Sequence, residues 1–285
     1  MDAAHLIKEL DAKVLQCKED AFAVNTRKTY STHKKAYLSF CKLIQVSPFP
    51  ASSKNIARYA VYLSKTKKYS TVKQYLNIIR LIHLENNLPN PLENDFNLTL
   101  VLRGLKRSLG CGVIRRLPIT AFHLYHMAKK LDLNNIEHVV FWGAAILLFF
   151  TLLRRGCVLA TKQDFDPQRH LCRGDITISP VGATVRVRHS KTIQFRDREL
   201  VFPLPRMKGN PLCPVRSIYA AIKCVKADPS SPVFMLSPQT YLSPEKFIQM
   251  TRHFLSDIVT DGSLLGAQSY RRGGASFFIS KQCKF

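Results

Sequence analysis

The sequence predicts a mainly α-helical protein with a small antiparallel β-sheet, divided into two domains. Apolar residues recur at helical spacing in several segments before residue 110. The fifteen residues Val139–Leu153 are apolar almost throughout, which is typical of a helix buried on all sides. Between residues 175 and 202 the period changes to the alternation expected of β-strands. A chain of 285 residues is also long enough for about two domains.

The first predicted helix, Asn25–Ile44, has one apolar face and one basic face. The apolar and small side chains that recur at helical spacing are Tyr30, His33, Tyr37, Phe40, Cys41 and Ile44. The cations fall on a different arc and are Arg27, Lys28, Lys34, Lys35 and Lys42. We expect the first face to pack into a core and the second to remain exposed to solvent.

Three more helices are expected before residue 110. Ser53 is expected to cap one of them, and Ser70 or Thr71 the next, because hydroxyl side chains satisfy the free N–H groups of a helix start. Asparagines and prolines over residues 86–91 indicate a loop, and a shorter helix is expected near Leu98–Leu109. These elements form a helical domain of residues 25–109, preceded by an extension of residues 1–24.

The second domain is expected to follow a glycine-containing linker at residues 110–117 and to span residues 118–285. Its central helix is the apolar run Val139–Leu153. Strands are expected near residues 175–178, 184–189 and 199–202, and further helices over residues 215–225 and 244–258. A last helix is expected to begin at Ser269.

The chain carries a strong excess of positive charge. Its 43 Lys and Arg residues against 19 Asp and Glu residues give a formal charge of +24 at pH 7. Between Asn25 and Arg80 there are twelve cations and no carboxylate, whereas a helix face that only meets solvent usually mixes both signs. This bias indicates a polyanionic partner, with nucleic acid preferred over an acidic membrane.

The cysteines and the apolar runs indicate an intracellular protein. None of the eight cysteines forms a CxxC pair, so neither a zinc ribbon nor a dense disulfide framework is expected. No apolar run is long enough to span a bilayer, and residues 1–15 lack the apolar core of a signal peptide. For His123 and His126, a partly buried helix face is favoured over a metal site.

Three cations occupy positions where packing alone does not explain a charge. Arg154 ends the apolar run, Lys191 follows a predicted strand, and Arg271 lies near the start of the last helix. A buried arginine without an anionic partner is costly, so Arg154 needs either a ligand or a neighbour such as Asp164 or Asp166. For Lys191 alone, a solvated hairpin lysine is the simpler interpretation.

Taken in order, these three positions resemble the catalytic motifs of the tyrosine recombinase, or phage integrase, family. Thr151-Leu-Leu-Arg154 resembles the family's Thr-Gly-Leu-Arg box, and His189-Ser-Lys191-Thr resembles its β-hairpin lysine motif. Ser269-Tyr-Arg271-Arg-Gly-Gly-Ala275 resembles the form found in recombinases of eukaryotic mobile elements of the Crypton and DIRS kind. The basic helical half is similar to the family's core-binding domain, so the resemblance covers the chain from Asn25 onwards.

The resemblance implies a protein that binds double-stranded DNA and acts in DNA integration or recombination. Arg154 and Arg271 would hold the oxygens of the scissile phosphate, and Lys191 would protonate the 5′-hydroxyl leaving group. A tyrosine would form a 3′-phosphotyrosyl bond without cofactor or metal, because the arginines supply the positive charge. Family members assemble on DNA as tetramers, so a homo-oligomer is expected, in the nucleus if the source is eukaryotic. Neither a membrane nor a small-molecule substrate is implied.

The sequence departs from the family pattern in three places. Gln268 stands where the family usually has a histidine, and an amide cannot exchange a proton. Cys157 stands where bacterial members carry a glutamate. The family's nucleophilic tyrosine lies further beyond the second arginine than the fourteen residues that follow Arg271. We therefore expect the catalytic domain to lack its last helices and the chain to be catalytically incomplete, with neither Tyr241 nor Tyr270 as a substitute.

Candidate DNA contacts are the cations of the basic stretch and of the linker region. They are Arg27, Lys28, Lys34, Lys35, Lys42, Lys65, Lys67, Lys68, Lys73, Arg107, Arg115 and Arg116. The alternative function is a non-enzymatic helical module that binds RNA or single strands through residues 25–80, where tyrosines interleave with lysines. Gly273 and Gly274 fit either a phosphate cradle or close packing beneath the site, and close packing is favoured.

Overall fold

The computed structural model describes residues 3–110, 112, 115–190 and 199–282. By its contacts the chain forms two compact units, Met1–Val113 and Ile114–Phe285, and each unit has its own apolar core. The division falls inside the region predicted as the linker. Within the described ranges, no helix combines the length and the apolar character that crossing a membrane requires.

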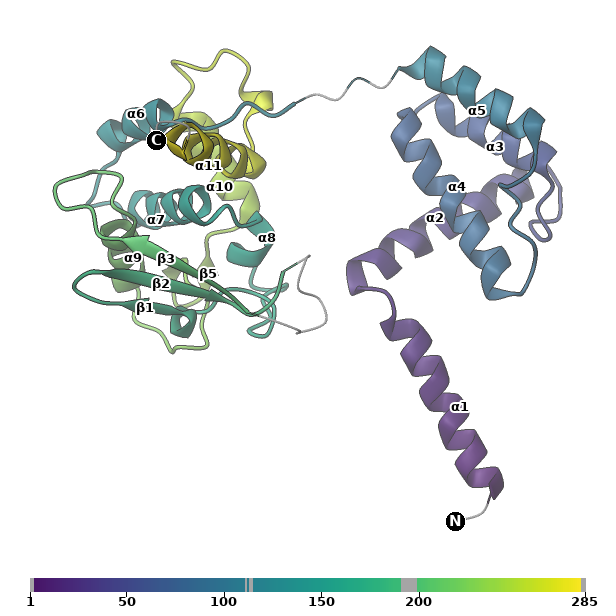
Figure 1. Ribbon diagram of the computed structural model, residues 1–285, viewed down its shortest axis with the longest axis horizontal. Helices are drawn as coiled ribbons and strands as arrows, with labels where there is room; N and C mark the ends of the chain where they lie inside the picture. Colours follow the sequence, from purple (N-terminus) through teal and green to yellow (C-terminus); the bar gives the residue numbers. More distant parts are fainter. Residues whose placement is uncertain (1–2, 111, 113–114, 191–198, 283–285) are drawn as a thin grey trace. The chain divides into compact units, whose positions relative to one another are not determined.

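The described part of the first unit is helical throughout (Figure 1). Its helices are α1 (Ala3–Asp20), α2 (Val24–Leu43), α3 (Ser53–Ser64), α4 (Tyr69–Glu85) and α5 (Phe96–Leu109). The apolar face predicted for α2 is confirmed, because His33, Tyr37 and Phe40 are buried against α3 and α4. Helix α1 buries none of its residues, which explains why no core pattern revealed it in the predicted extension.

Two predicted helix caps are wrong, although the helices themselves are confirmed. Helix α3 is capped by Ser52, whose hydroxyl accepts a hydrogen bond from the Asn55 N–H, and Ser53 is its first helical residue. Helix α4 begins at Tyr69 after Lys68, without a side-chain cap. Apolar spacing identifies the buried face of a helix, but it does not decide which of two neighbouring hydroxyl residues lies at the cap position.

The second unit surrounds the apolar helix α7 (Ile136–Thr151) with helices and one main sheet. Its other helices are α6 (Ala121–Lys130), α8 (Arg155–Val158), α9 (Pro214–Lys223), α10 (Pro244–Phe254) and α11 (Ala267–Gln282), with short 3-10 helices η1 (Arg173–Asp175) and η2 (Gly262–Leu264). Helix α7 packs against α9 and α11, and Figure 1 shows it between α11 and the sheet. It begins earlier and ends earlier than the apolar run predicted.

The predicted three-stranded antiparallel sheet is confirmed. It consists of β1 (Ile176–Ile178), β2 (Gly182–Val187) and β3 (Leu200–Pro205) in the order β1-β2-β3. Val185 lies opposite Ile176 on one side and Phe202 on the other, and it faces the core. A second hairpin of β4 (Met235–Ser237) and β5 (Thr240–Tyr241) was not predicted, because strands this short carry almost no alternation.

Candidate phosphate-binding site

Arg154 lies just beyond the end of α7. The Thr151 hydroxyl donates to the Leu147 carbonyl at 2.7 Å within the last turn of that helix. Leu152 then takes a left-handed conformation with φ of 56°, which ends the helix and turns the chain. As a result Arg154 is exposed immediately before α8, rather than buried at the end of α7 as the sequence suggested.

The exposed position of Arg154 removes the need for an internal carboxylate partner. Arg154 forms no ion pair with Asp164 or Asp166, and Asp164 accepts a hydrogen bond from the Thr161 hydroxyl at 2.7 Å instead. The ion pairs found within the described residues all involve other cations. The interpretation of Arg154 as an internal ion-pair partner is therefore wrong for the described chain, and its guanidinium is open to an external anion.

Arg271 is brought towards Arg154 by two glycines that let α11 approach its neighbours closely. A Cβ atom added to Gly273 would lie 1.6 Å from the Ile119 carbonyl oxygen, and one added to Gly274 would lie 2.1 Å from the Phe149 carbonyl oxygen. No larger residue fits at either position without moving backbone. The prediction that these glycines serve close packing is thus confirmed, and this packing sets the position of the partly exposed Arg271 on α11.

The two arginines line one cavity of about 400 Å³ in the second unit. Its lining residues are Arg116, Leu153, Arg154, Arg155, Ile248, Gly266, Ala267, Gln268 and Arg271. Four guanidinium groups therefore share the cavity, and no carboxylate of the described residues lines it. Like charges at such a site repel one another, and an anion that binds there reduces this repulsion. Planar guanidinium groups are well suited to hold phosphate oxygens in pairs.

Cys157 is buried close to Arg154 and Arg271. Burial raises the pKa of its thiol, while the charges of Arg154 and Arg271 act in the opposite direction. The thiol therefore stays neutral at neutral pH and does not balance the arginines.

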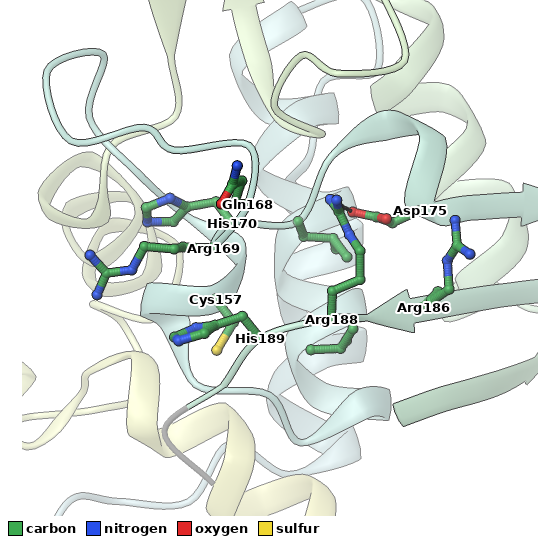
Figure 2. Close-up of a pocket in the computed structure, with 10 residues that line it drawn as sticks. Cys157, Gln168, Arg169, His170, Asp175, Arg186, Arg188 and His189 are labelled. Carbon is green, nitrogen blue, oxygen red and sulfur yellow. Dashed lines mark hydrogen bonds and ion pairs between the residues drawn. The ribbon is translucent and has the colours of Figure 1, made fainter. Parts of the chain in front are cut away.

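A smaller hollow lies between the end of β2 and residues 168–171, as Figure 2 shows. In it the Arg188 guanidinium donates to the Asp175 carboxylate at 2.8 Å. That carboxylate also accepts the Cys172 backbone N–H at 2.9 Å, so the network fastens the end of β2 to the loop before β1. Lys191, which the sequence placed just beyond this strand, lies outside the described residues. No group of three metal-binding side chains occurs in the described ranges.

Most of the predicted DNA-binding cations are exposed. On α2 these are Lys28, Lys34, Lys35 and Lys42, and Arg27 is half-buried. Lys65, Lys68, Lys73, Arg107, Arg115 and Arg116 are also exposed, whereas Lys67 is half-buried. Within the described part of the first unit, none of these side chains forms an ion pair. The basic face of α2 is therefore free of internal carboxylates, and its role in DNA binding stays a prediction.

His123 and His126 have separate structural roles on α6. His123 completes the helix cap with Thr120, whose backbone N–H donates to its Nδ1 at 3.0 Å. His126 lies 2.9 Å from the Asp257 carboxylate, which also accepts a hydrogen bond from Lys130 at 2.5 Å. Lys130 is the main cause that lowers the pKa of Asp257 to about 2. Sequence spacing did not reveal this carboxylate, because it comes from the turn after α10, far along the chain.

Comparison with solved structures identifies the fold of the chain. The chain is similar to lambda integrase residues 75–356 bound to DNA, with 14% identity and a TM-score of 0.59 over 97% of this chain and 87% of that chain. It is also similar to the Tn1549 transposon integrase in complex with transposon right end DNA, with 12% identity and a TM-score of 0.58 over 95% and 85% of the two chains. The chain has the fold of a tyrosine recombinase. It matches no protein-family model and no curated protein.

Within the tyrosine recombinase fold, the structure separates the tyrosines from the arginine cavity. Tyr270 is fully buried, and its hydroxyl lies 3.0 Å from the Thr251 hydroxyl. Burial raises the pKa of Tyr270 well above its usual range. Tyr241 lies in β5 with its ring against Phe165. No tyrosine of the described residues lines the cavity, in agreement with the expectation that Tyr241 and Tyr270 are packing residues.

Sequence reasoning missed two members of the cavity in this recombinase fold. Arg155 was not singled out, although it directly follows Arg154 and therefore had a signal in the sequence. Arg116 was assigned to the linker, and its place in the cavity depends on a contact with residues near 263 that no local pattern reveals. Gln268, predicted from the motif, is exposed and lines the cavity beside Arg271.

Proposed function

We propose that this chain binds duplex DNA and takes part in DNA integration or recombination, with one backbone phosphate held in the arginine cavity. The observation that carries the proposal is the meeting of Arg154 and Arg271 in a cavity whose described lining has no carboxylate. These residues come from two distant segments, and no described carboxylate in the cavity balances their charges, so an anion from outside the chain can bind to both. The DNA-bound state of the similar integrases supports duplex DNA as the anion.

In this proposal Arg154 and Arg271 each donate two N–H groups to the non-bridging oxygens of the phosphate. Their fixed geometry favours the added charge of a pentacoordinate phosphorus over the ground state. Gln268 donates its amide to the same phosphate but supplies no proton. Lys191 is assigned as the general acid for the 5′-hydroxyl on the basis of the sequence motif that it belongs to.

We further propose that neither Tyr241 nor Tyr270 attacks the phosphate, so that residues 1–285 hold DNA without forming a phosphotyrosyl bond. The buried hydroxyl of Tyr270 supports this, since attack requires an exposed phenol within reach of the phosphate. Several copies are proposed to assemble on one duplex. A dimer of lambda integrase bound to a core site, at 15% identity and a TM-score of 0.53, is the basis for that analogy.

The proposal is tested by binding of the full chain to a duplex, to the same sequence as single-stranded DNA, and to single-stranded RNA. We expect the duplex to bind most tightly and its affinity to fall steeply with salt, because many phosphates are neutralised at once. Preference for single-stranded RNA would support the non-enzymatic module instead. A nicked suicide duplex then tests the chemistry: a covalent adduct that disappears in Tyr270→Phe or Tyr241→Phe would refute the assignment of the tyrosines.

A further inference from the structure

Hydrogen bonds of both its side chain and its backbone hold Arg116 in the arginine cavity. Its guanidinium donates through Nη1 to the Ser263 carbonyl, and its own carbonyl accepts a hydrogen bond from the Arg272 guanidinium. The following residues continue this pairing, since the Leu117 N–H donates to the Leu264 carbonyl at 2.9 Å. The side chain is thereby held at one place in the cavity before any ligand binds, which reduces the entropy lost on binding.

The guanidinium of Arg116 has N–H groups that its contact with Ser263 does not use. A guanidinium has five N–H groups, and the contact with Ser263 uses one nitrogen. Its Nε lies 3.7 Å from the position that a Cβ of Gly266 would occupy, so glycine backbone without a side chain forms the neighbouring wall. Neither Ser263 nor Gly266 carries a carboxylate, and Arg116 is exposed to solvent. The remaining N–H groups are therefore accessible to a ligand in the cavity.

The charge of the cavity exceeds what one phosphodiester balances. A phosphodiester carries a single negative charge, and Arg154 with Arg271 already provides two positive charges for it. Arg116 and Arg155 add two further cations, and the described lining residues include no carboxylate. A neighbouring phosphate of the same strand is the anion that a DNA ligand supplies next to the first.

We propose that Arg116 holds a second phosphate, adjacent to the one between Arg154 and Arg271, so that the cavity takes two consecutive phosphates of one DNA strand. The inference rests on the proposed function and extends it, since it assigns a DNA contact in the second unit that the recombinase motifs do not include. Arg116 acts as a positioning residue: by fixing the neighbouring phosphate, it sets which internucleotide linkage lies between the two motif arginines.

The test uses two small probes that differ only in the number of phosphates. Thymidine 3′,5′-bisphosphate carries two phosphates separated by one sugar, as consecutive DNA phosphates are, and thymidine 5′-monophosphate carries one. Binding of each to the full chain is measured by calorimetry at constant ionic strength. We expect the bisphosphate to bind about tenfold more tightly, from charge-assisted hydrogen bonds to the second phosphate. The Arg116→Gln variant should lose this preference and keep its affinity for the monophosphate.

A matched control separates phosphate binding from the structural bond that Arg116 makes. Arg252 also donates to a carbonyl of this region, that of Leu265 at 3.4 Å, but it does not line the cavity. Arg252→Gln should therefore retain the tenfold preference. Equal affinity of the wild-type chain for both probes, or an unchanged preference in Arg116→Gln, would overturn the inference.

If Arg116→Gln fails to fold, as judged by circular dichroism, Arg116→Lys takes its place. A lysine keeps the charge, but it lacks the planar guanidinium that can donate to the Ser263 carbonyl and to a phosphate at the same time. Its preference for the bisphosphate should fall several-fold, and an unchanged preference would again refute the inference. The proposed function fails in a different way, through loss of the duplex preference itself, so the two failures are distinguishable.

Discussion

Gly273 and Gly274 determine at the residue scale how the cavity is assembled. Both positions lie on α11 where backbone carbonyls of other segments occupy the space of a side chain. Arg271 precedes them by two and three residues, so its distance from Arg154 depends on this close approach. The role of the glycines is therefore indirect: they line no part of the cavity, but the arginine cluster needs them.

Gly273→Ala should destabilise the second unit by about 1–3 kcal/mol or more, because a methyl group meets the Ile119 backbone rather than a movable side chain. Urea denaturation followed by the fluorescence of Trp142, which lies in α7, measures the change. Gly156→Ala is the control, since nothing lies within 4 Å of its added Cβ and its stability should not fall. Equal stability of the Gly273→Ala variant and wild type would contradict the packing role.

Arg154→Gln should leave the stability of the second unit unchanged or slightly raised, because Arg154 has no ion pair among the described residues and lies near other cations. Its affinity for a generic duplex should change little, because the protein contacts many other phosphates as well. Thermal unfolding and duplex titration check the two statements.

Arg173 provides the contrast for that prediction. It is buried and donates to the carbonyls of Val225 at 2.5 Å and Pro232 at 3.3 Å. Arg173→Gln should cost about 1–3 kcal/mol, since those carbonyls are left unsatisfied. A large loss of stability in Arg154→Gln instead would mean that Arg154 has a structural partner after all.

At the element scale, α2 combines an apolar face that holds the first unit together with a basic face that is free to bind. His33 belongs to the apolar face, where its ring stacks on Tyr75 with 3.8 Å between the ring centroids. Tyr75 and the fully buried Tyr59 are thus engaged in packing, which disfavours base stacking by these two tyrosines. Burial is also the main cause that lowers the pKa of His33 from 6.5.

The lowered pKa of His33 predicts that the first unit loses stability in mild acid. The unfolded chain binds the proton first, so the contribution of His33 is complete above pH 6.5 and is lost as the pH falls from 6.5 towards the folded pKa. Hydrogen exchange of α2 and α4 peptides, corrected for intrinsic rates, should show weaker protection below pH 6.5. His33→Gln should flatten this dependence, and His5→Gln on the exposed α1 should not. A pH dependence that survives in His33→Gln would assign it to another group.

At the scale of the whole molecule, positive charge is concentrated where carboxylates are absent. The chain has a formal charge of +24, and the stretch from residue 25 to residue 80 contains no acidic residue. The ion pairs of the described residues all lie in the second unit. Among the described residues, the cations of the first unit are therefore not paired with its own carboxylates.

Removal of Arg27, Lys34 and Lys35 together, each replaced by Gln, should weaken duplex binding to a similar extent for every DNA sequence. The slope of log affinity against log salt should shrink by about 0.9 for each phosphate that the variant no longer neutralises. The control replaces Lys8, Lys13 and Lys18 on α1, which removes the same charge next to carboxylates, and should reduce the slope less. If both triple variants behave alike, net charge rather than the face of α2 governs binding.

Patterns within single segments were sufficient to predict the main helices and strands and to single out Arg154 and Arg271. The apolar spacing of α2–α4 and the run in α7 indicate burial directly, because the period of a helix or strand determines which side chains share a face. The same holds for the motif positions Arg154 and Arg271, whose neighbours in the sequence mark them. Helix α1 and the short β4–β5 hairpin had no such pattern, since neither forms a long buried face.

Only the tertiary structure decided what surrounds each functional group. It showed that Arg154 is exposed, that Arg116 joins the cavity, and that Asp257 meets His126. These contacts join segments that are far apart in the chain. They depend on how closely the backbones pack, whereas spacing along a helix determines only which neighbouring residues share a face. The sequence by itself therefore determined the elements and the excess of positive charge, because local periodicity and composition are properties of the chain. The meeting of the arginines in one cavity depends on long-range packing, which local patterns do not encode.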